Sequence, residues 1–377
     1  MFRKISILFI SLCISFLLVG CQHKTVQKKN YEVQSSIHFA KGFALYNYKD
    51  YSKLVIKSPY PNAKEQFEYY LVKKGTHPKI KEGKVITVPL KKVVVTSTTH
   101  IPMLTALKVE KTLVGFPNLK YISSPSVRQL IDQNKVQELG NSMQINTEIL
   151  LNLKPDVLIG FSMQSQNKMY STIEKSGIPV ILNGDWLETT PLGRAEWLKL
   201  FGALYNKSSE ADSLFKAIVT DYNSAKEIAK KATEKPTILA GILYKNVWNL
   251  PAGESFVAQF LKDANTNYYW QNDKGTGSLN LSFETVLNTA QNADYWIAPS
   301  NFMSFNQMKE SNLHYTKFKP FRMKKIFTFA LTQGETGGVI YYEEAPLKPN
   351  IVLKDIIKIT HPNLLPNYKP YFLKKLN

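Results

Sequence analysis

Short apolar runs alternate with amphipathic stretches over much of the chain, beginning at Val93. The run Val93–Val95 is continuous and β-branched, and a stretch with helical spacing follows it. Continuous apolar strands that alternate with helices are typical of a parallel sheet covered on both faces. The pattern predicts strands at 93–95, 113–116, 157–160 and 178–182, and helices at 102–108 and 168–176.

A longer helical pattern follows. Between Pro191 and Lys231, apolar residues recur at spacings of three, four and seven, which predicts one long helix or two nearly collinear helices. The alternation restarts after Pro236 and predicts strands at 237–243, 295–298 and 326–330, and helices at 255–262, 282–289 and 350–359. The expected fold class is therefore α/β, with two Rossmann-like lobes joined by one long helix.

The region before Val93 has a different pattern. Short aromatic or β-branched runs between Phe39 and Val72 are separated by Pro and Gly, which predicts strands and turns. The expected domains are a β-rich N-terminal appendage at 37–90, an N-lobe at 91–190, a linking helix at 191–232 and a C-lobe at 233–377.

The chain begins with a basic and then apolar leader. Arg3 and Lys4 precede the run Ile5–Val19, which is shorter than the ~20 residues of a transmembrane helix. The run ends in Leu-Val-Gly-Cys21, so the segment resembles a bacterial lipoprotein signal, which implies cleavage before Cys21 and a lipid on it. We expect a signal peptide at 1–20, a lipidated tether at 21–36 and a place on the periplasmic side of a bacterial membrane; an uncleaved anchor is the alternative.

The formal net charge is +19 at pH 7. The lysines are scattered without an arginine-rich block, which favours a solvated basic surface, or attraction of an anionic ligand or lipid, over nucleic acid binding. Cys13 belongs to the leader and Cys21 to the lipid site, so no disulfide or thiol catalysis is expected. The sequence has no Gly-x-Ser-x-Gly, P-loop or Gly-x-Gly-x-x-Gly motif, and its histidines lack ligand spacing, so we expect no catalytic residue, cofactor or metal site.

An internal repeat marks one helix in each predicted lobe. Glu148 and Glu284 each begin the pattern Glu-x-x-Leu-Asn, and Asp156 and Asp294 each precede a predicted strand. A carboxylate in the first turn of a helix interacts favourably with the helix dipole. The two glutamates therefore either stabilise helix ends or form a pair of outward docking points, one per lobe. The expected N-caps are Thr147 and Ser282.

These motifs, in their order and spacing, resemble the class III substrate-binding proteins of bacterial ABC importers for iron–siderophore complexes, haem and vitamin B12. The resemblance covers about 91–360 and is carried by the lipobox and by segments 93–100, 121–128, 148–159, 193–197, 253–255 and 284–294. It implies that Glu148 and Glu284 pair with arginines of a permease dimer, which works with ATPase subunits.

Ligands of open α/β sheets bind beyond the carboxyl ends of the strands. This rule selects the loops after the predicted strands, which are rich in aromatic and hydroxyl groups and suit a bulky, partly apolar chelate. The candidates are Ser97, Thr98, Thr99, Tyr121, Ser123, Ser124, Arg128, Phe161, Met163, Asp185 and Trp186 in the first lobe, and Tyr244, Trp248, Ser255, Phe302 and the turn Gly334–Gly338 in the second.

Several candidates have a second interpretation. Trp186 and Trp248 are equally compatible with core positions, and the glycine turn with ordinary loop geometry. Arg128 is the better candidate for an anionic ligand, whereas Arg194 is expected to be a cap or core partner.

The sequence thus predicts a monomeric, lipid-anchored protein that captures a ferric siderophore, haem or cobalamin and passes it to an ABC permease without altering it. Two alternatives remain open at this stage. One is an extracytoplasmic hydrolase or lyase on a two-lobed scaffold. The other is an adhesion or assembly lipoprotein that uses residues 37–90 as its interaction surface.

Overall fold

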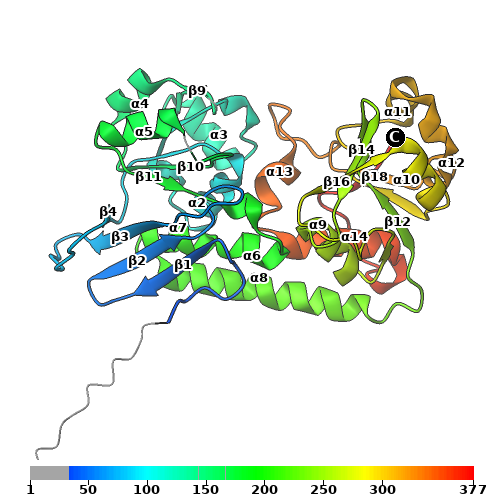
Figure 1. The fold of residues 1–377 in the computed structure, drawn as a ribbon, viewed down its shortest axis with the longest axis horizontal. Coiled ribbons are helices and arrows are strands. Elements are labelled where there is room, and N and C mark those ends of the chain that lie inside the picture. The colour runs from blue at the N-terminus through cyan, green and yellow to red at the C-terminus, as the bar shows by residue number, and fades with distance from the viewer. Residues whose placement is uncertain (1–33, 143, 166) are drawn as a thin grey trace, which may run out of the picture. The chain divides into compact units, whose positions relative to one another are not determined.

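The computed structural model describes residues 34–142, 144–165 and 167–377 (Figure 1). The predicted signal peptide, Cys21 and nearly all of the predicted tether lie outside the described residues.

The first described strands form a four-stranded sheet in the order β1-β2-β3-β4, where a β-rich region was expected. Neighbours pair antiparallel except β3 and β4, which are parallel. The inner face of this sheet is not a separate core: Phe43 and Leu54 belong to the same buried cluster as Val93 and Trp197. The strands are β1 Phe43–Asn47, β2 Tyr51–Ile56, β3 Phe67–Lys73 and β4 Lys84–Val88.

The first α/β lobe is built on a parallel sheet of order β11-β10-β5-β6-β7. Val93 and Val95 pack into one buried cluster, whereas Val94 between them packs into another. Both faces of the sheet are therefore buried, as the continuous apolar runs predicted. Its elements are β5 Val93–Val95, α2 Ile101–Ala106, β6 Leu113–Phe116, α3 Pro125–Asp132, β7 Gln137–Glu138, α4 Thr147–Leu153, β10 Val157–Gly160, α5 Lys168–Lys175 and β11 Val180–Leu182, with a small hairpin of β8 Gly140–Asn141 and β9 Gln144–Ile145.

The second lobe repeats this plan with the strand order β15-β12-β17-β18-β19, in which only β19 is antiparallel. The predicted strand 237–243 is interrupted at Gly241, whose φ of 76° and tight approach to the carbonyl of Asn249 divide it into β12 and β13. The elements are β12 Thr237–Ala240, α9 Phe256–Asp263, β15 Asn267–Tyr268, α10 Phe283–Ala290, β17 Tyr295–Ile297, α11 Phe305–Ser311, α12 Lys319–Arg322, β18 Ile326–Thr328, α13 Ile340–Glu344, α14 Pro349–Thr360 and β19 Lys374–Lys375, with an antiparallel sheet of β13 Ile242–Tyr244, β14 Val247–Pro251 and β16 Ser278–Ser282.

The internal repeat of the sequence corresponds to equivalent positions in the two lobes. Asp156 accepts hydrogen bonds from the backbone amides of Lys91 and Lys92 just before β5, at 2.6 and 2.9 Å. Asp294 accepts one from the amide of Thr237 at the start of β12, at 2.9 Å. Each aspartate thus joins the start of its own strand to the start of the neighbouring strand, which gives the repeat a structural role.

The linking region is three helices and not one or two: α6 Pro191–Glu196, α7 Leu198–Leu204 and α8 Ser208–Ala229. The main break follows α7, where Asn206 adopts a φ of 55°. Helices α7 and α8 then meet so closely that a Cβ on Gly202 would lie 2.5 Å from that of Ala211. The long helix α8 packs Ala211 into the core of the first lobe and Tyr222 into that of the second.

The segment that contains α13 is a second link between the lobes. It follows β18 of the second lobe, and α13 packs against α2 and the short helix Thr98–His100 of the first lobe. Leu347, just after α13, belongs to the first lobe's buried cluster. The chain then enters α14, which packs along α8.

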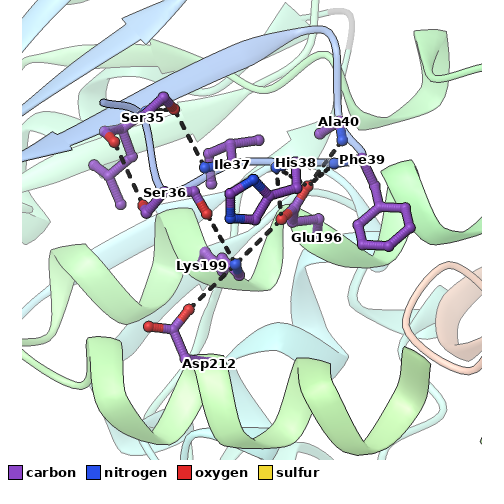
Figure 2. Close-up of polar contacts among 10 residues, drawn as sticks. Ser35, Ser36, Ile37, His38, Phe39, Ala40, Glu196, Lys199 and Asp212 are labelled. Atoms are coloured by element: carbon purple, nitrogen blue, oxygen red, sulfur yellow. Dashed lines mark hydrogen bonds and ion pairs between the residues drawn. The ribbon is translucent and has the colours of Figure 1, made fainter. Parts of the chain in front are cut away.

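Two buried carboxylates fix the first described residues to the first lobe, and Figure 2 shows one of them, Glu196. Glu196, which is 0% exposed, accepts hydrogen bonds from the amides of Phe39 and Ala40 at 2.6 and 2.9 Å, and one from His38. Lys199 forms ion pairs with Glu196 and with Asp212 (Figure 2). The N-terminal clasp is our name for the segment 38–42 together with Glu196, Lys199, Asp212 and a second carboxylate, Glu188.

The second carboxylate of the clasp is Glu188. It accepts hydrogen bonds from the amides of Lys41 and Gly42, at 3.0 and 2.8 Å, and from the indole Nε1 of Trp197 at 3.0 Å. Glu196 and Trp197 belong to the sequence motif at 193–197, so part of that motif serves to hold the N-terminal segment.

Candidate functional site

A cavity of about 270 Å³ lies where the loops after β5, β6 and β10 meet the second link. The first lobe supplies the hydroxyl groups of Ser97 and Thr98 and the aromatic rings of Tyr121 and Phe161. The carboxyl ends of the parallel strands therefore form one wall, as the rule for α/β sheets predicts. The full lining is Thr96, Ser97, Thr98, Phe116, Pro117, Asn118, Tyr121, Ser142, Phe161, Gly338, Val339 and Tyr342, and none of these side chains is charged at neutral pH.

The opposite wall of the cavity is formed by Gly338, the last residue of the turn Gly334–Gly338, with Val339 and Tyr342 at the start of α13. The turn approaches the first lobe closely: a Cβ on Gly338 would lie 2.8 Å from the carbonyl oxygen of Tyr121. Thr336 donates a hydrogen bond to the carbonyl of Lys120 at 2.7 Å, and Ser123 donates one to that of Gly338 at 3.2 Å. Glycine in this turn therefore allows the second lobe's chain to contact the first lobe.

A buried carboxylate completes this contact. Glu343 on α13 is 2% exposed and accepts hydrogen bonds from the amides of Ser123 and Ser124, at 2.6 and 3.0 Å. These amides begin α3, whose N-cap Ser124 makes no side-chain cap of its own, so a carboxylate from the other lobe satisfies the helix end. Burial raises the pKa of Glu343 to about 7, although the two amide hydrogen bonds act to lower it.

The remaining first-lobe candidates lie at the margin of the cavity or away from it. Thr99 faces Ser97 at 3.0 Å between hydroxyl oxygens, and both Ser123 and Ser124 engage Glu343. Met163 is exposed and lines a separate surface hollow. Arg128 donates to the carbonyl of Leu119 at 2.9 Å, so its guanidinium is engaged within its own lobe.

Asp185 was expected in a ligand-facing loop, but it is 2% exposed. Its amide donates to the side chain of Asn183, and its charge lies near the fully buried His100. Burial lowers the pKa of His100 to about 4, because no solvent stabilises the imidazolium.

Among the second-lobe candidates, only the turn Gly334–Gly338 reaches the cavity, through Gly338. Trp248 is instead a core residue: it is 0% exposed, donates from Nε1 to the carbonyl of Ala240 and packs 5.3 Å from Trp296 between ring centres. Phe302 packs edge-on against Tyr315 at the margin of the same core. Tyr244 is 66% exposed at the end of β13.

Ser255 and Trp186 line another cavity, between α9 and the loop before α6. Ser255 is the N-cap of α9 and accepts from the amide of Ala258.

The sequence interpretation missed seven of the twelve residues that line the cavity. Phe116 and Asn118 follow a predicted strand and could have been found by the rule that selected their neighbours. Val339 and Tyr342 carried no comparable signal, because they lie beyond the glycine turn in the second link and reach the cavity only through long-range packing. The additional residues are Thr96, Phe116, Pro117, Asn118, Ser142, Val339 and Tyr342.

Glu148 and Glu284 occupy the first turns of α4 and α10, which precede the equivalent strands β10 and β17. Both side chains are exposed. Ser282 caps α10 as expected, but the cap of α4 is Asn146, whose side chain accepts from the amide of Ile149. Thr147 was expected as this cap; it is the first helical residue, because the turn that ends β9 places Asn146 in the extended conformation that a cap requires.

Neither a metal cluster nor a membrane-spanning helix occurs in the described part of the chain. Within residues 34–142, 144–165 and 167–377, no group of three or more His, Cys, Asp or Glu side chains could hold a metal ion. Over the same ranges, every helix is too short or too polar to cross a bilayer.

Two α/β lobes, each built on a five-stranded and mainly parallel sheet, a long joining helix and a cavity at the carboxyl ends of the first lobe's strands define a two-lobed solute-binding protein. The chain belongs to the periplasmic binding protein family, whose model matches residues 93–318. This places it among proteins that bind solutes outside the cytoplasm.

Individual proteins resemble the chain over most of its length. An uncharacterized lipoprotein of Methanocaldococcus jannaschii is 29% identical over 304 residues, which cover 78% of this chain and 70% of the relative. A periplasmic heme binding protein of Pseudomonas aeruginosa has the same fold, with a TM-score of 0.58 and 16% identity, covering 76% of this chain and 98% of that one. An ABC-type Fe3+-hydroxamate transport protein of Saccharomonospora viridis gives a TM-score of 0.53 and 15% identity, covering 72% and 94%.

Proposed function

We propose that this protein captures a metal chelate, namely a ferric siderophore, haem or cobalamin, and delivers it to the permease of an ABC importer. The observation that carries the proposal is the cavity between the first lobe and the second link, with its uncharged lining of hydroxyl groups and aromatic rings. Tyr121 and Tyr342, 52% and 53% exposed, face this cavity from the two sides. Aromatic rings with a few polar groups suit a large, partly apolar ligand.

The size of the cavity bears on how such a ligand binds. Its volume of about 270 Å³ is at the lower limit of the ~300–1,000 Å³ of drug-sized pockets. A bulky chelate would place one face against the four aromatic rings and leave another at the open mouth, or would displace the turn Gly334–Gly338. Capture without chemical change fits a site whose lining offers no general base or nucleophile beyond hydroxyl groups.

A direct test is titration of the purified chain, beginning at Ser35, with a hydroxamate ferric siderophore, hemin and cyanocobalamin. We expect one of the three to bind saturably, with a change in its absorption spectrum and full recovery of the unaltered compound. The proposal is wrong if none binds, or if the bound compound is converted into a product.

Delivery would depend on Glu148 and Glu284. They are exposed, lie at equivalent helix starts and belong one to each lobe, so they could engage two equivalent cationic sites of a permease dimer. We expect the double variant Glu148→Lys and Glu284→Lys to abolish uptake while chelate affinity stays normal. The matched control is Glu234→Lys with Glu310→Lys, two other exposed glutamates, and uptake should survive in it. Survival of uptake in both double variants would refute the docking role.

Membrane attachment through a lipid on Cys21 is part of the same proposal, as is action as a monomer. The lipoprotein relative and the solute-binding family support a protein held at the outer surface of a membrane. Replacement of Cys21 by Ala should release the protein from membranes without loss of chelate binding. Retention of Cys21→Ala in the membrane fraction would favour an uncleaved anchor.

A further inference from the structure

We propose that a second, smaller cavity around Arg194 binds a carboxylate group of the transported ligand. This cavity measures about 120 Å³ and lies between α6, α9 and α13. Arg194 is the only charged residue of its lining, which is otherwise formed by Pro191, Phe256, Phe260, Tyr341, Tyr342, Ala345, Pro346 and Pro349. The inference rests on the proposed function, because it assigns a property to the same ligand.

The guanidinium of Arg194 has no anionic partner among the residues that the structure describes. Its Nε is buried and without a hydrogen bond, and its Cζ lies 4.5 Å from the centre of the Phe256 ring. A cation–π contact offsets part of the cost of removing this charge from water, but it satisfies none of the five N–H donors. The side chain is therefore oriented by Phe256 while its donors stay available.

Two other cations with mostly buried side chains are satisfied within the chain. Lys199 has a side chain that is 10% exposed, and it pairs with Glu196 at 3.1 Å and Asp212 at 3.3 Å. Arg128, 13% exposed in its side chain, donates to the carbonyl of Leu119. Arg194 differs from both, which indicates that its partner arrives from outside the chain.

The chemistry of the cavity favours a carboxylate. The Nε–H and one Nη–H of an arginine form a planar fork that matches the two oxygens of a carboxylate. The space of about 120 Å³ admits a group of this size, and the surrounding rings and prolines lower the local polarity, which strengthens an ion pair.

Tyr342 connects this cavity to the proposed chelate site, because it lines both. The larger cavity holds no charged side chain and gives no preference between anionic and neutral chelates. Arg194 would supply that preference: the body of the chelate would contact Tyr121 and Tyr342, and a carboxylate arm would reach past Tyr342 to the guanidinium. The inferred substrate class is therefore a chelate that carries at least one free carboxylate.

Matched pairs of probes test this inference in the chain from Ser35 onward. The first pair is hemin, which has two carboxylates, and hemin dimethyl ester, which has none; the second is ferric citrate and the uncharged ferrichrome. We expect the chain to bind the carboxylate member of at least one pair ten or more times more tightly than its neutral counterpart. In Arg194→Met, which keeps an apolar stem, this preference should disappear while affinity for the neutral member stays unchanged.

Acetate, a small carboxylate, tests the cavity around Arg194 independently of the proposed chelate ligand. Sodium acetate should raise the melting temperature of the unmodified chain by about 2 °C over sodium chloride of equal concentration, and should have no such effect on Arg194→Met. Arg322→Met, at an exposed arginine elsewhere, should respond to acetate like the unmodified chain. Melting temperatures in chloride show whether each variant is folded. If Arg194→Met is unfolded, Arg194→Lys takes its place. This variant keeps the positive charge but lacks the planar guanidinium, so it should retain only part of the acetate effect.

An acetate effect without binding of any chelate would support the carboxylate site and refute the proposed ligand. Equal responses of the unmodified chain and a folded Arg194 variant to acetate, together with equal probe preferences, would overturn the inference.

Discussion

The carboxylate of Glu343 accepts a hydrogen bond from the backbone amide of Ser123 at 2.6 Å, although 220 positions separate the two residues in the chain. This bond and the neighbouring one from Ser124 attach α13 to the start of α3, next to the cavity. Because α13 also forms one wall of that cavity, the state of Glu343 is coupled to the shape of the proposed binding site.

Glu343 gives a prediction for the pH dependence of stability. Burial raises its pKa from 4.5 to about 7 in the folded protein. Because the pKa is higher in the folded than in the unfolded state, the protonated carboxyl contributes fully to the free energy of unfolding below about pH 4.5. This contribution is lost as the pH rises through about 7. Relative to Glu343→Gln, the free energy of unfolding of the unmodified chain should therefore fall by on the order of 3 kcal/mol between pH 4.5 and 8.

Urea unfolding of both proteins at pH 4.5, 6, 7 and 8 measures this difference. Comparison of the two removes the contributions of other titrating groups, including the buried His100, whose lowered pKa acts in the opposite direction. Two parallel stability profiles would show that Glu343 does not change its ionisation on unfolding over this range.

The two exposed phenols should contribute directly to chelate affinity. Tyr121→Ala and Tyr342→Ala should each weaken binding about tenfold, because each removes an aromatic face worth roughly 1–1.5 kcal/mol from the cavity. Tyr244→Ala is the control, since Tyr244 is also exposed but lies on the β13–β14 hairpin away from this cavity. Titration monitored by ligand absorbance gives the dissociation constant of the chelate for each of the three variants. Equal dissociation constants would show that the chelate does not bind in this cavity.

Loss of Glu196 should destabilise the fold more than loss of a surface glutamate. Glu196→Ala leaves three backbone amides without their acceptor in a buried region and removes one of the two ion pairs of Lys199, which costs about 3–5 kcal/mol. Glu227→Ala, which removes only an exposed pair with Lys230, should cost less than about 1 kcal/mol. Guanidinium unfolding measures both, and similar values for the two would mean that the N-terminal clasp adds little stability.

Trp248 should behave as a core residue in mutagenesis. Trp248→Ala should lower the free energy of unfolding by about 3–5 kcal/mol, because it opens a void among Trp296, Tyr315 and Phe318. Chelate affinity at a temperature where the variant is still folded should not change. A selective loss of affinity with normal stability would instead support the ligand contact expected from the sequence.

The central strands of both lobes followed from local pattern, because each is a short apolar run that is largely buried. Val93–Val95 and Val157–Gly160 are found where the sequence predicted them. The division of the linking region into three helices was harder to predict, because the apolar spacing continues through the break between α7 and α8. Asn206 adopts a left-handed backbone conformation that ends the helical run, and Gly202 permits the close contact between α7 and α8. Neither residue disturbs the spacing of the apolar residues.

The candidate site was predictable mainly on its first-lobe side, and from the second lobe only the glycine turn was selected, of which Gly338 lines the cavity. Ser97, Thr98, Tyr121 and Phe161 were selected because sheet topology places the loops after parallel strands at one edge. Tyr342 and Glu343 lie on a five-residue helix with no distinctive pattern, and their partners are more than two hundred positions away. Arg194 shows the same limit, because an arginine without a carboxylate partner is recognisable only once its surroundings are known.

The N-terminal clasp also determines where the protein can be cut. The backbone amides of residues 38–42 donate hydrogen bonds to Glu196 and Glu188, and the carbonyl of Ser36 accepts one from Lys199. A recombinant version trimmed to the first strand at Phe43 would leave Glu188 with only the indole of Trp197 and Glu196 with only Lys199 as donors. Expression designs should therefore leave Ser35 and everything after it intact.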